Sequence, residues 1–225
     1  GGDSLKKRAK LFASFLFKGS FYIIDIDENR KTRDSLVIKA IDDEKAGFYK
    51  KYLTDHQFRV ADVCFKIADR IGMSSEEKYF LAQEALLHDI GKFFVSEEPW
   101  MKKGPLKEEE YKKIKDHAIL GAEYLERKHF AEGIIRAVRH HHERYDGQGY
   151  PDGLKGEKIP INSRIIAVAD AFDAMTYGRD YKTPMSQNRV LRELEANALS
   201  QFDPNVVRAF KSLLEEREAV LECSR

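Results

Sequence analysis

The sequence predicts a mainly α-helical protein with a small N-terminal segment that contains short β-strands. From about residue 44 onward, apolar residues recur at helical spacing, and typical helix-starting and helix-ending residues separate the segments. Before that point, two β-type runs at Phe21–Ile26 and Leu36–Ile41 flank a charged turn region. We therefore expect a strand-containing segment over residues 1–43 and a helical domain over residues 44–225.

The composition is typical of a globular chain and argues against several classes of protein. Hydrophobic residues make up 42% of the 225 residues, which is enough for a sizeable core. The net charge of +1 leaves no broad basic surface for duplex nucleic acid. Apolar runs are much shorter than the roughly 20 residues of a membrane-spanning helix. With only two cysteines, we expect a cytoplasmic protein in which Cys64 packs in the core.

Local signals mark the first helices of the expected domain. An amphipathic pattern extends over Glu44–Ile71, and the glycine that follows is a natural helix end. Ser74 and, three residues later, Glu77 form the pattern of a capping box, which predicts a second helix over about residues 75–90. Both helices carry histidines among their apolar residues.

The later helices follow a loop that is rich in proline and glycine. The final helix has the clearest start, because Asp203 is a favourable N-cap and Pro204 suits the first helical position. The expected helices after the loop cover about residues 107–127, 130–142 and Ile161–Tyr177, a segment that begins near Ser186, and a last segment from Pro204.

Histidines and carboxylates recur on these successive segments. An isolated histidine is usually a packed or surface residue, but a repeated pattern favours a metal site. Asp89 lies in an apolar stretch, and burying its carboxylate costs several kcal/mol unless a cation or hydrogen bonds compensate. The same argument applies to Asp170 and Asp173. The candidate ligands are His56, His88, Asp89, His117, His141, His142 and Asp170.

The types of ligand indicate which metals are expected. Mixed imidazole and carboxylate ligands without thiolate suit Fe, Mn or Zn, and a carboxylate that bridges two ions favours Fe or Mn. A carboxylate has two oxygens, so Asp89 could bind two ions while His88 binds one. We therefore expect two divalent ions. His129 and His140 lack this context, and we expect neither to have a functional role.

Two motifs together resemble a known family. HDIGK at His88–Lys92 and HHERYDGQGYP at His141–Pro151 resemble the HD-GYP family, bacterial cyclic di-GMP phosphodiesterases within the HD superfamily. The resemblance covers roughly residues 50–215. It implies an HD-domain helical bundle that hydrolyses cyclic di-GMP to linear pGpG, or further to GMP, by metal-dependent attack of water.

The resemblance also implies a role for each site residue. Asp89 would bridge the two ions. One ion would be completed by His56, His88 and Asp170, and the other by His117, His141 and His142.

The resemblance places further residues around the substrate. Lys92 and Arg179 would neutralise the phosphate oxygens, with Lys182 lining the same pocket. Asp173 is the candidate for proton transfer. Tyr150 belongs to the loop that carries Gly149, Tyr150 and Pro151, here called the GYP loop, and would contact substrate. The same loop would dock to a diguanylate cyclase (GGDEF) partner.

Some positions depart from the family pattern. Tyr52 stands where some members have a glutamate that binds a third metal, which favours two ions here. Asp180 adds a negative charge beside an anionic substrate. Three alternatives therefore stay open: hydrolysis of another cyclic dinucleotide, hydrolysis of (p)ppGpp, which the GYP loop disfavours, and a catalytically weak module that binds a nucleotide or a partner. A homodimer is also compatible with the long first helix.

Overall fold

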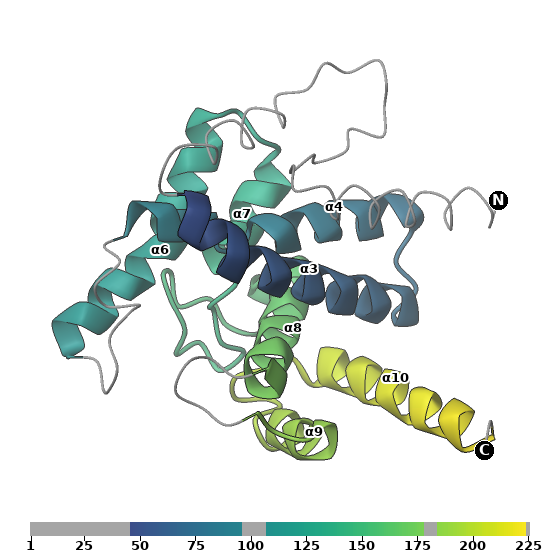
Figure 1. Ribbon diagram of the computed structural model, residues 1–225. Coiled ribbons are helices and arrows are strands. Elements are labelled where there is room, and N and C mark those ends of the chain that lie inside the picture. The colour runs from purple at the N-terminus through teal and green to yellow at the C-terminus, as the bar shows by residue number, and fades with distance from the viewer. Residues whose placement is uncertain (1–45, 96–106, 178–183, 224–225) are drawn as a thin grey trace.

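The computed structural model describes residues 46–95, 107–177 and 184–223 (Figure 1). Within these ranges the chain is helical and contains no strand beyond an isolated bridge between Ala198 and Phe202. This confirms the mainly α-helical prediction. The expected segment over residues 1–43, with its two strands, lies outside the described residues.

The helices follow the predicted order, and most begin where local signals place them. Ser74 accepts a hydrogen bond from the backbone of Glu77, and the Glu77 carboxylate accepts one from the backbone of Ser74, which confirms the capping box. Asp203 caps the last helix by accepting from the Asn205 backbone at 2.7 Å. The elements are α3 (Ala46–Arg70), α4 (Ser75–Leu87), η1 (Ile90–Phe94), α6 (Glu108–Arg127), α7 (Glu132–His140), η2 (Gly156–Lys158), α8 (Ile161–Tyr177), α9 (Gln187–Ala196) and α10 (Pro204–Cys223).

Two predicted helices end earlier than expected, both next to candidate site residues. The second helix ends at Leu87, not near residue 90, and the short 3₁₀ helix η1 follows. The helix predicted over residues 130–142 is α7, which ends at His140. The reason at the first position is tertiary: Gly91 packs against the backbone of α6 at His117 and Gly121. A side chain on Gly91 would prevent this contact.

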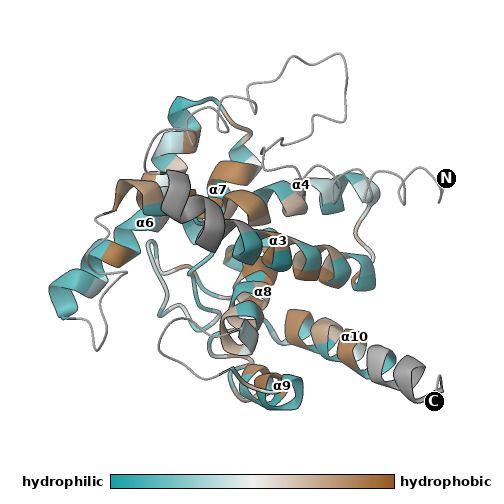
Figure 2. Cartoon of the chain, in the orientation of Figure 1, coloured by the Kyte–Doolittle hydropathy of each residue, from teal (hydrophilic) through white to brown (hydrophobic). Residues whose placement is uncertain are grey.

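Two hydrophobic clusters hold the helices together. The larger one joins α3, α4, α8, α9 and α10, together with Ala137 of α7, and includes the fully buried Cys64, as predicted. The smaller one joins η1, α6 and α7. Because α4 contributes Ala85 to the first cluster and Leu87 to the second, its C-terminal end lies between them. Figure 2 shows apolar residues along α8 and a polar N-terminal half of α6.

None of the helices in the described part of the chain combines the length and apolar character that a membrane span requires.

Candidate metal centre

The structure brings the seven predicted ligands together in two groups. In each group, every residue offers one nitrogen or oxygen, and these atoms lie within 4.8 Å of one another. The residues come from α3, the α4–η1 turn, α6, the C-terminal end of α7 and α8. One group consists of Asp89, His117, His141 and His142, and the other of His56, His88 and Asp170.

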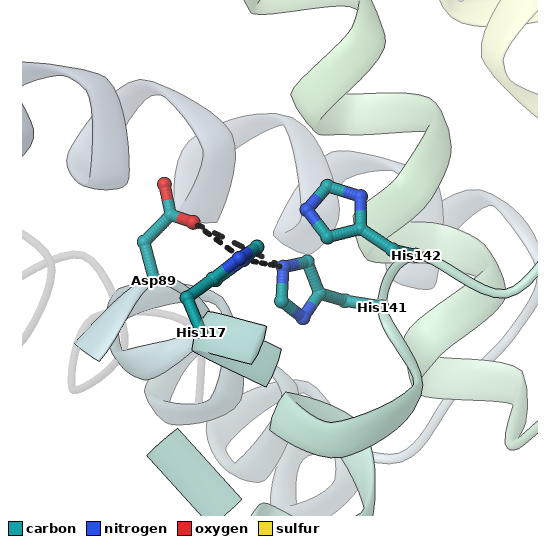
Figure 3. Close-up of side chains that lie close together, drawn as sticks. All are labelled: Asp89, His117, His141 and His142. Carbon is teal, nitrogen blue, oxygen red and sulfur yellow. Dashed lines mark hydrogen bonds and ion pairs between the residues drawn. The ribbon is translucent and has the colours of Figure 1, made fainter. Parts of the chain in front are cut away.

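The Asp89 carboxylate connects the two groups. Its Oδ1 lies 3.4 Å from Nε2 of His117 and 3.9 Å from Nε2 of His141, and Figure 3 shows this side. Its Oδ2 lies 3.3 Å from Nε2 of His88 and 3.7 Å from Nε2 of His56. Each oxygen therefore faces a different group, which is the arrangement expected of a carboxylate that bridges two cations.

Hydrogen bonds at Nδ1 orient the imidazole rings. Nδ1 lies 2.6 Å from a backbone carbonyl in His88, His117 and His141. A carbonyl oxygen only accepts, so Nδ1 carries the hydrogen, and the Nε2 lone pair of the neutral ring points into the cluster. In His56, Nδ1 lies 2.7 Å from Oδ2 of Asp173. Hydrogen bonding of this kind fixes histidines that bind metal ions.

Several buried nitrogens have an environment that a cation would complete. Nε2 of His117 and Nε2 of His141 are 3.2 Å apart, although both nitrogens act as acceptors when their rings are neutral (Figure 3). Nε2 of His56 and Nε2 of His88 are buried and make no hydrogen bond, although each faces a carboxylate oxygen, Oδ1 of Asp170 at 3.2 Å and Oδ2 of Asp89 at 3.3 Å. Buried polar atoms that make no hydrogen bond are rare. The nitrogen and oxygen donors present therefore fit divalent metal ions.

The protonation states of the group formed by Asp89, His117, His141 and His142 also favour cation binding. Burial lowers the pKa of His117 and His141, and it lowers the pKa of His142 to about 3, so these rings are neutral at pH 7. Burial would raise the pKa of Asp89, but Lys92, His88 and His117 outweigh it and hold the pKa well below the usual range. An anionic carboxylate and neutral imidazoles are the forms that bind metals.

His56 differs from the other histidines. Burial acts to lower its pKa, but Asp170 and Asp173 outweigh burial and raise the pKa to about 9. A proton on His56 and a metal ion therefore compete for the same ring.

Lys92, the predicted phosphate contact, lies within the cluster. Its side chain is buried, and Nζ lies 2.5 Å from Oδ2 of Asp89. The lysine follows Asp89 by three residues through η1, so this short 3₁₀ helix directs it back to the carboxylate. The cluster thus contains a positive side chain in addition to the groups that could bind metal.

Asp173 is held between His56 and an arginine that sequence reasoning missed. Arg59 donates to both oxygens of Asp173, at 2.5 and 3.0 Å, and its guanidinium lies 4.1 Å from the centre of the Tyr177 ring. One sequence signal was available, because Arg59 follows His56 by three residues and shares its helix face. These contacts give Asp173 an orienting role toward His56. The predicted role in proton transfer stays a prediction.

The GYP loop is attached to the end of α7. The buried Glu143 carboxylate accepts from the backbone of Asp152 at 2.7 Å and of Leu154 at 3.1 Å. The Asp152 carboxylate in turn binds Arg139 and His140. His140 therefore helps to anchor the loop through a partner 12 residues away, a structural contact that was not predicted from the sequence. His129 is exposed, as expected.

Tyr150 lies against the metal centre. Its ring stacks on His142, with ring centres 5.0 Å apart and an angle of 27° between the planes. Gly149 makes this possible, since a side chain there would clash with the backbone of Glu143 and Arg144. Arg179 and Lys182 lie outside the described residues, as does the side chain of Tyr52.

Comparison with known proteins identifies the family. The chain matches the HD domain profile over residues 35–206 and therefore belongs to the HD domain family. It is 35% identical over 210 residues to the cyclic di-GMP phosphodiesterase response regulator RpfG of Xanthomonas campestris pv. campestris, an alignment that covers 92% of this chain and 53% of the relative. It is 40% identical over 164 residues to a cyclic di-GMP phosphodiesterase of Thermotoga maritima, covering 72% and 44%.

Further similarity comes from another relative and from a solved structure. The chain is 36% identical over 163 residues to the 3′3′-cGAMP-specific phosphodiesterase 3 of Vibrio cholerae, covering 72% of this chain and 35% of the relative. It thus spans about half or less of these curated relatives. Bd1817, an HDGYP protein from Bdellovibrio bacteriovorus, has the same fold, with a TM-score of 0.62, 18% identity, and coverage of 81% of this chain and 62% of that chain. Within the HD domain family, the chain is of the HD-GYP type.

Proposed function

We propose that this protein is a metal-dependent phosphodiesterase that hydrolyses cyclic di-GMP to pGpG, with GMP as a further product to be tested. The observation that carries the proposal is the pair of nitrogen and oxygen groups joined by Asp89. Relatives that carry the name cyclic di-GMP phosphodiesterase support the substrate.

Two divalent ions, Fe or Mn, are the proposed cofactors. His56, His88 and Asp170 would hold one ion, His117, His141 and His142 the other, and Asp89 both. Bound ions would lower the pKa of water toward neutrality and so supply a nucleophile.

The remaining residues of the chain would bind and orient the substrate. Lys92 already balances the charge of Asp89 and lies beside the proposed ions, where it can contact a phosphate oxygen. Arg179 and Lys182 are proposed to bind the same phosphodiester. Asp173 would keep His56 in position and, as a separate proposal, transfer a proton. Tyr150 would contact the substrate from the loop side.

Metal analysis and product analysis on one anaerobic preparation test the proposal. We expect about two Fe or Mn ions per chain, and linear pGpG or GMP as chromatographic products of cyclic di-GMP. Asp89→Ala should lose both metal and turnover, whereas Asp69→Ala, an exposed change on α3, should lose neither. Retention of metal and near-normal turnover by Asp89→Ala would contradict the proposal.

A second candidate function is hydrolysis of a different cyclic dinucleotide. The support is the similarity to a 3′3′-cGAMP-specific phosphodiesterase, whose identity of 36% lies between the 35% and 40% of the cyclic di-GMP relatives. Assays with cyclic di-GMP and 3′3′-cGAMP side by side distinguish the two. Tight binding of a nucleotide without turnover would instead favour a catalytically weak signalling module.

The expected partners and location are also proposals. Hydrogen bonds to Glu143 and the ion pair of Asp152 with Arg139 hold the GYP loop in place, and this supports its use as a surface for a diguanylate cyclase. A pull-down with and without a charge reversal at Lys155, an exposed loop residue, tests this contact. A homodimer and a cytoplasmic location are proposed as well, and sedimentation and cell fractionation test them.

A further inference from the structure

A lysine on α6 lies between two aromatic rings beside the metal centre. Nζ of Lys115 is 4.6 Å from the centre of the Tyr111 ring and 5.2 Å from the centre of the Tyr150 ring. Tyr111 precedes Lys115 by one helical turn, so both side chains project from the same face of α6. An ammonium group within about 6 Å of a ring centre is attracted by the ring.

This cluster adjoins the proposed metal centre. Tyr150 stacks on the ring of His142, and α6 also carries His117, two residues after Lys115. Tyr111 is about half exposed (49%), and the Lys115 and Tyr150 side chains are partly exposed. A molecule bound at the metal centre can therefore reach both rings and the ammonium group.

In the part of the chain that the structure describes, no carboxylate matches the charge of Lys115. Three cations of the site and of the GYP loop are paired: Lys92 with Asp89, Arg139 with Asp152, and Arg144 with Asp146. By contrast, no carboxylate among the described residues lies within ion-pair distance of Lys115. A partly buried ammonium group held by two rings is suited to an anionic ligand.

The chemistry of a cyclic dinucleotide matches this cluster. Such a molecule has two phosphodiesters and two bases, but only one phosphodiester can react at the metal centre at a time. The other nucleotide must lie elsewhere, and it brings one negative charge and one flat ring system. Tyrosine rings stack on bases of any identity, and an ammonium group binds phosphate.

We propose that Tyr111, Lys115 and Tyr150 form a subsite for the nucleotide half of the substrate that does not react. Lys115 binds its phosphodiester, and the two tyrosine rings stack with its base. This inference rests on the proposed function, since it assumes that a cyclic dinucleotide reacts at the metal centre. Because stacking does not read the base edge, the subsite recognises the cyclic dinucleotide class rather than guanine.

Two substrates separate the subsite from the metal centre. Bis(p-nitrophenyl) phosphate has one phosphodiester and no second nucleotide, so it needs the metal centre alone. For Lys115→Gln we expect the KM for cyclic di-GMP to rise roughly tenfold with little change in kcat, because one phosphate contact is lost. Hydrolysis of bis(p-nitrophenyl) phosphate should stay unchanged. Lys113→Gln removes the same charge from an exposed position on α6 and should affect neither substrate.

Tyr111→Leu gives an independent measurement of stacking. It should raise the KM for cyclic di-GMP several-fold while leaving bis(p-nitrophenyl) phosphate unaffected, because a base loses one ring. Equal effects of Lys115→Gln on both substrates, or no effect on cyclic di-GMP, would overturn the subsite. If the unaltered protein hydrolyses neither substrate, the proposed function fails, and equilibrium titration with cyclic di-GMP still decides the subsite: binding must weaken in Lys115→Gln but not in Lys113→Gln.

Discussion

At the scale of single residues, the group that binds Nδ1 of each histidine determines how its ring is oriented in the cluster. Backbone carbonyls hold His88, His117 and His141, and these contacts come from the preceding turn of the same segment. His56 instead depends on Asp173, which is 117 residues away. The orientation of His56 is thus the one in this set that a side-chain substitution can remove.

Replacing Asp173 with asparagine tests whether this residue orients His56 or transfers a proton. We expect the affinity for the ion bound by His56 to fall roughly 10- to 100-fold, because a hydrogen-bonding partner of a metal ligand is weakened. Metal content at limiting metal concentration measures this directly. Asp62→Asn, an exposed change on α3, is the matched control. Full metal content with a large loss of kcat would instead support the role in proton transfer.

Glu84 is another buried carboxylate, and no function in the site has been assigned to it. Its side chain is 3% exposed, and Oε2 has no hydrogen-bond partner. Burial raises the pKa of Glu84 from 4.5 to about 7, partly opposed by a hydrogen bond with Asn162. Because the pKa is higher in the folded state, stability is fully present below about pH 4.5 and is lost as the pH rises through about 7.

Glu84→Gln should remove this pH dependence. Relative to the unaltered protein, the variant should gain up to about 3 kcal/mol of unfolding free energy between pH 4.5 and pH 8, since each pKa unit corresponds to about 1.4 kcal/mol. Urea unfolding of metal-free protein at several pH values measures the difference, in which other titrating groups cancel. A difference that is constant across this range would show that Glu84 has an ordinary pKa.

At the scale of elements, close backbone contacts determine where the site residues lie. Gly91 in η1 packs against α6 so closely that an added Cβ would lie 1.8 Å from the carbonyl oxygen of His117. The same contact places Asp89 beside His117, because Asp89 precedes Gly91 by two residues and His117 itself makes the contact. The close approach of η1 to α6 therefore also determines how close the two proposed ligands Asp89 and His117 lie to each other.

Gly91→Ala should push η1 and α6 apart. We expect a loss of about 2 kcal/mol or more in unfolding free energy, together with reduced metal content, because backbone atoms cannot yield as a side chain would. Gly133→Ala in α7 is the control: its Cβ would lie 3.6 Å from Glu84, which is ordinary contact, and alanine should stabilise the helix by about 0.5–1 kcal/mol. Chemical unfolding and metal analysis of both variants provide the comparison, and normal metal content in Gly91→Ala would argue against the coupling.

The outcome at each element shows what local sequence can predict. The start of α4 was predictable because Ser74 and Glu77 satisfy each other within one turn. Its end was not, because the glycine contact between η1 and α6 involves residues distant in sequence. Likewise, the motifs made the metal-binding candidates recognisable. Arg59 and the anchoring role of His140 were missed, since their partners lie in other segments.

At the scale of the whole molecule, the proposed metal centre connects elements that the hydrophobic clusters only partly join. The larger cluster includes residues of α3 and α8, the smaller one includes residues of η1 and α6, and α4 and α7 contribute to both. Asp89 faces ligands from both sets, with His56 on α3 and His117 on α6. Bound ions would therefore connect the two clusters across the end of α4. They would also neutralise the carboxylates of Asp89 and Asp170, whose negative charges are costly to bury without a cation.

Metal removal should accordingly lower the stability of the entire helical domain. A ligand that binds only the folded state adds RT ln(1 + [L]/Kd), which is about 2.7 kcal/mol for one site at a concentration one hundred times Kd. We expect a chelator to lower Tm by several degrees, since about 1 kcal/mol corresponds to roughly 2–4 °C in a domain of this size. Thermal unfolding with and without chelator measures the shift, and added Mn²⁺ should restore it. Asp89→Ala serves as the control, because a variant that binds no metal should not respond to the chelator. An equal response in both proteins would mean that the chelated ions bind elsewhere on the chain.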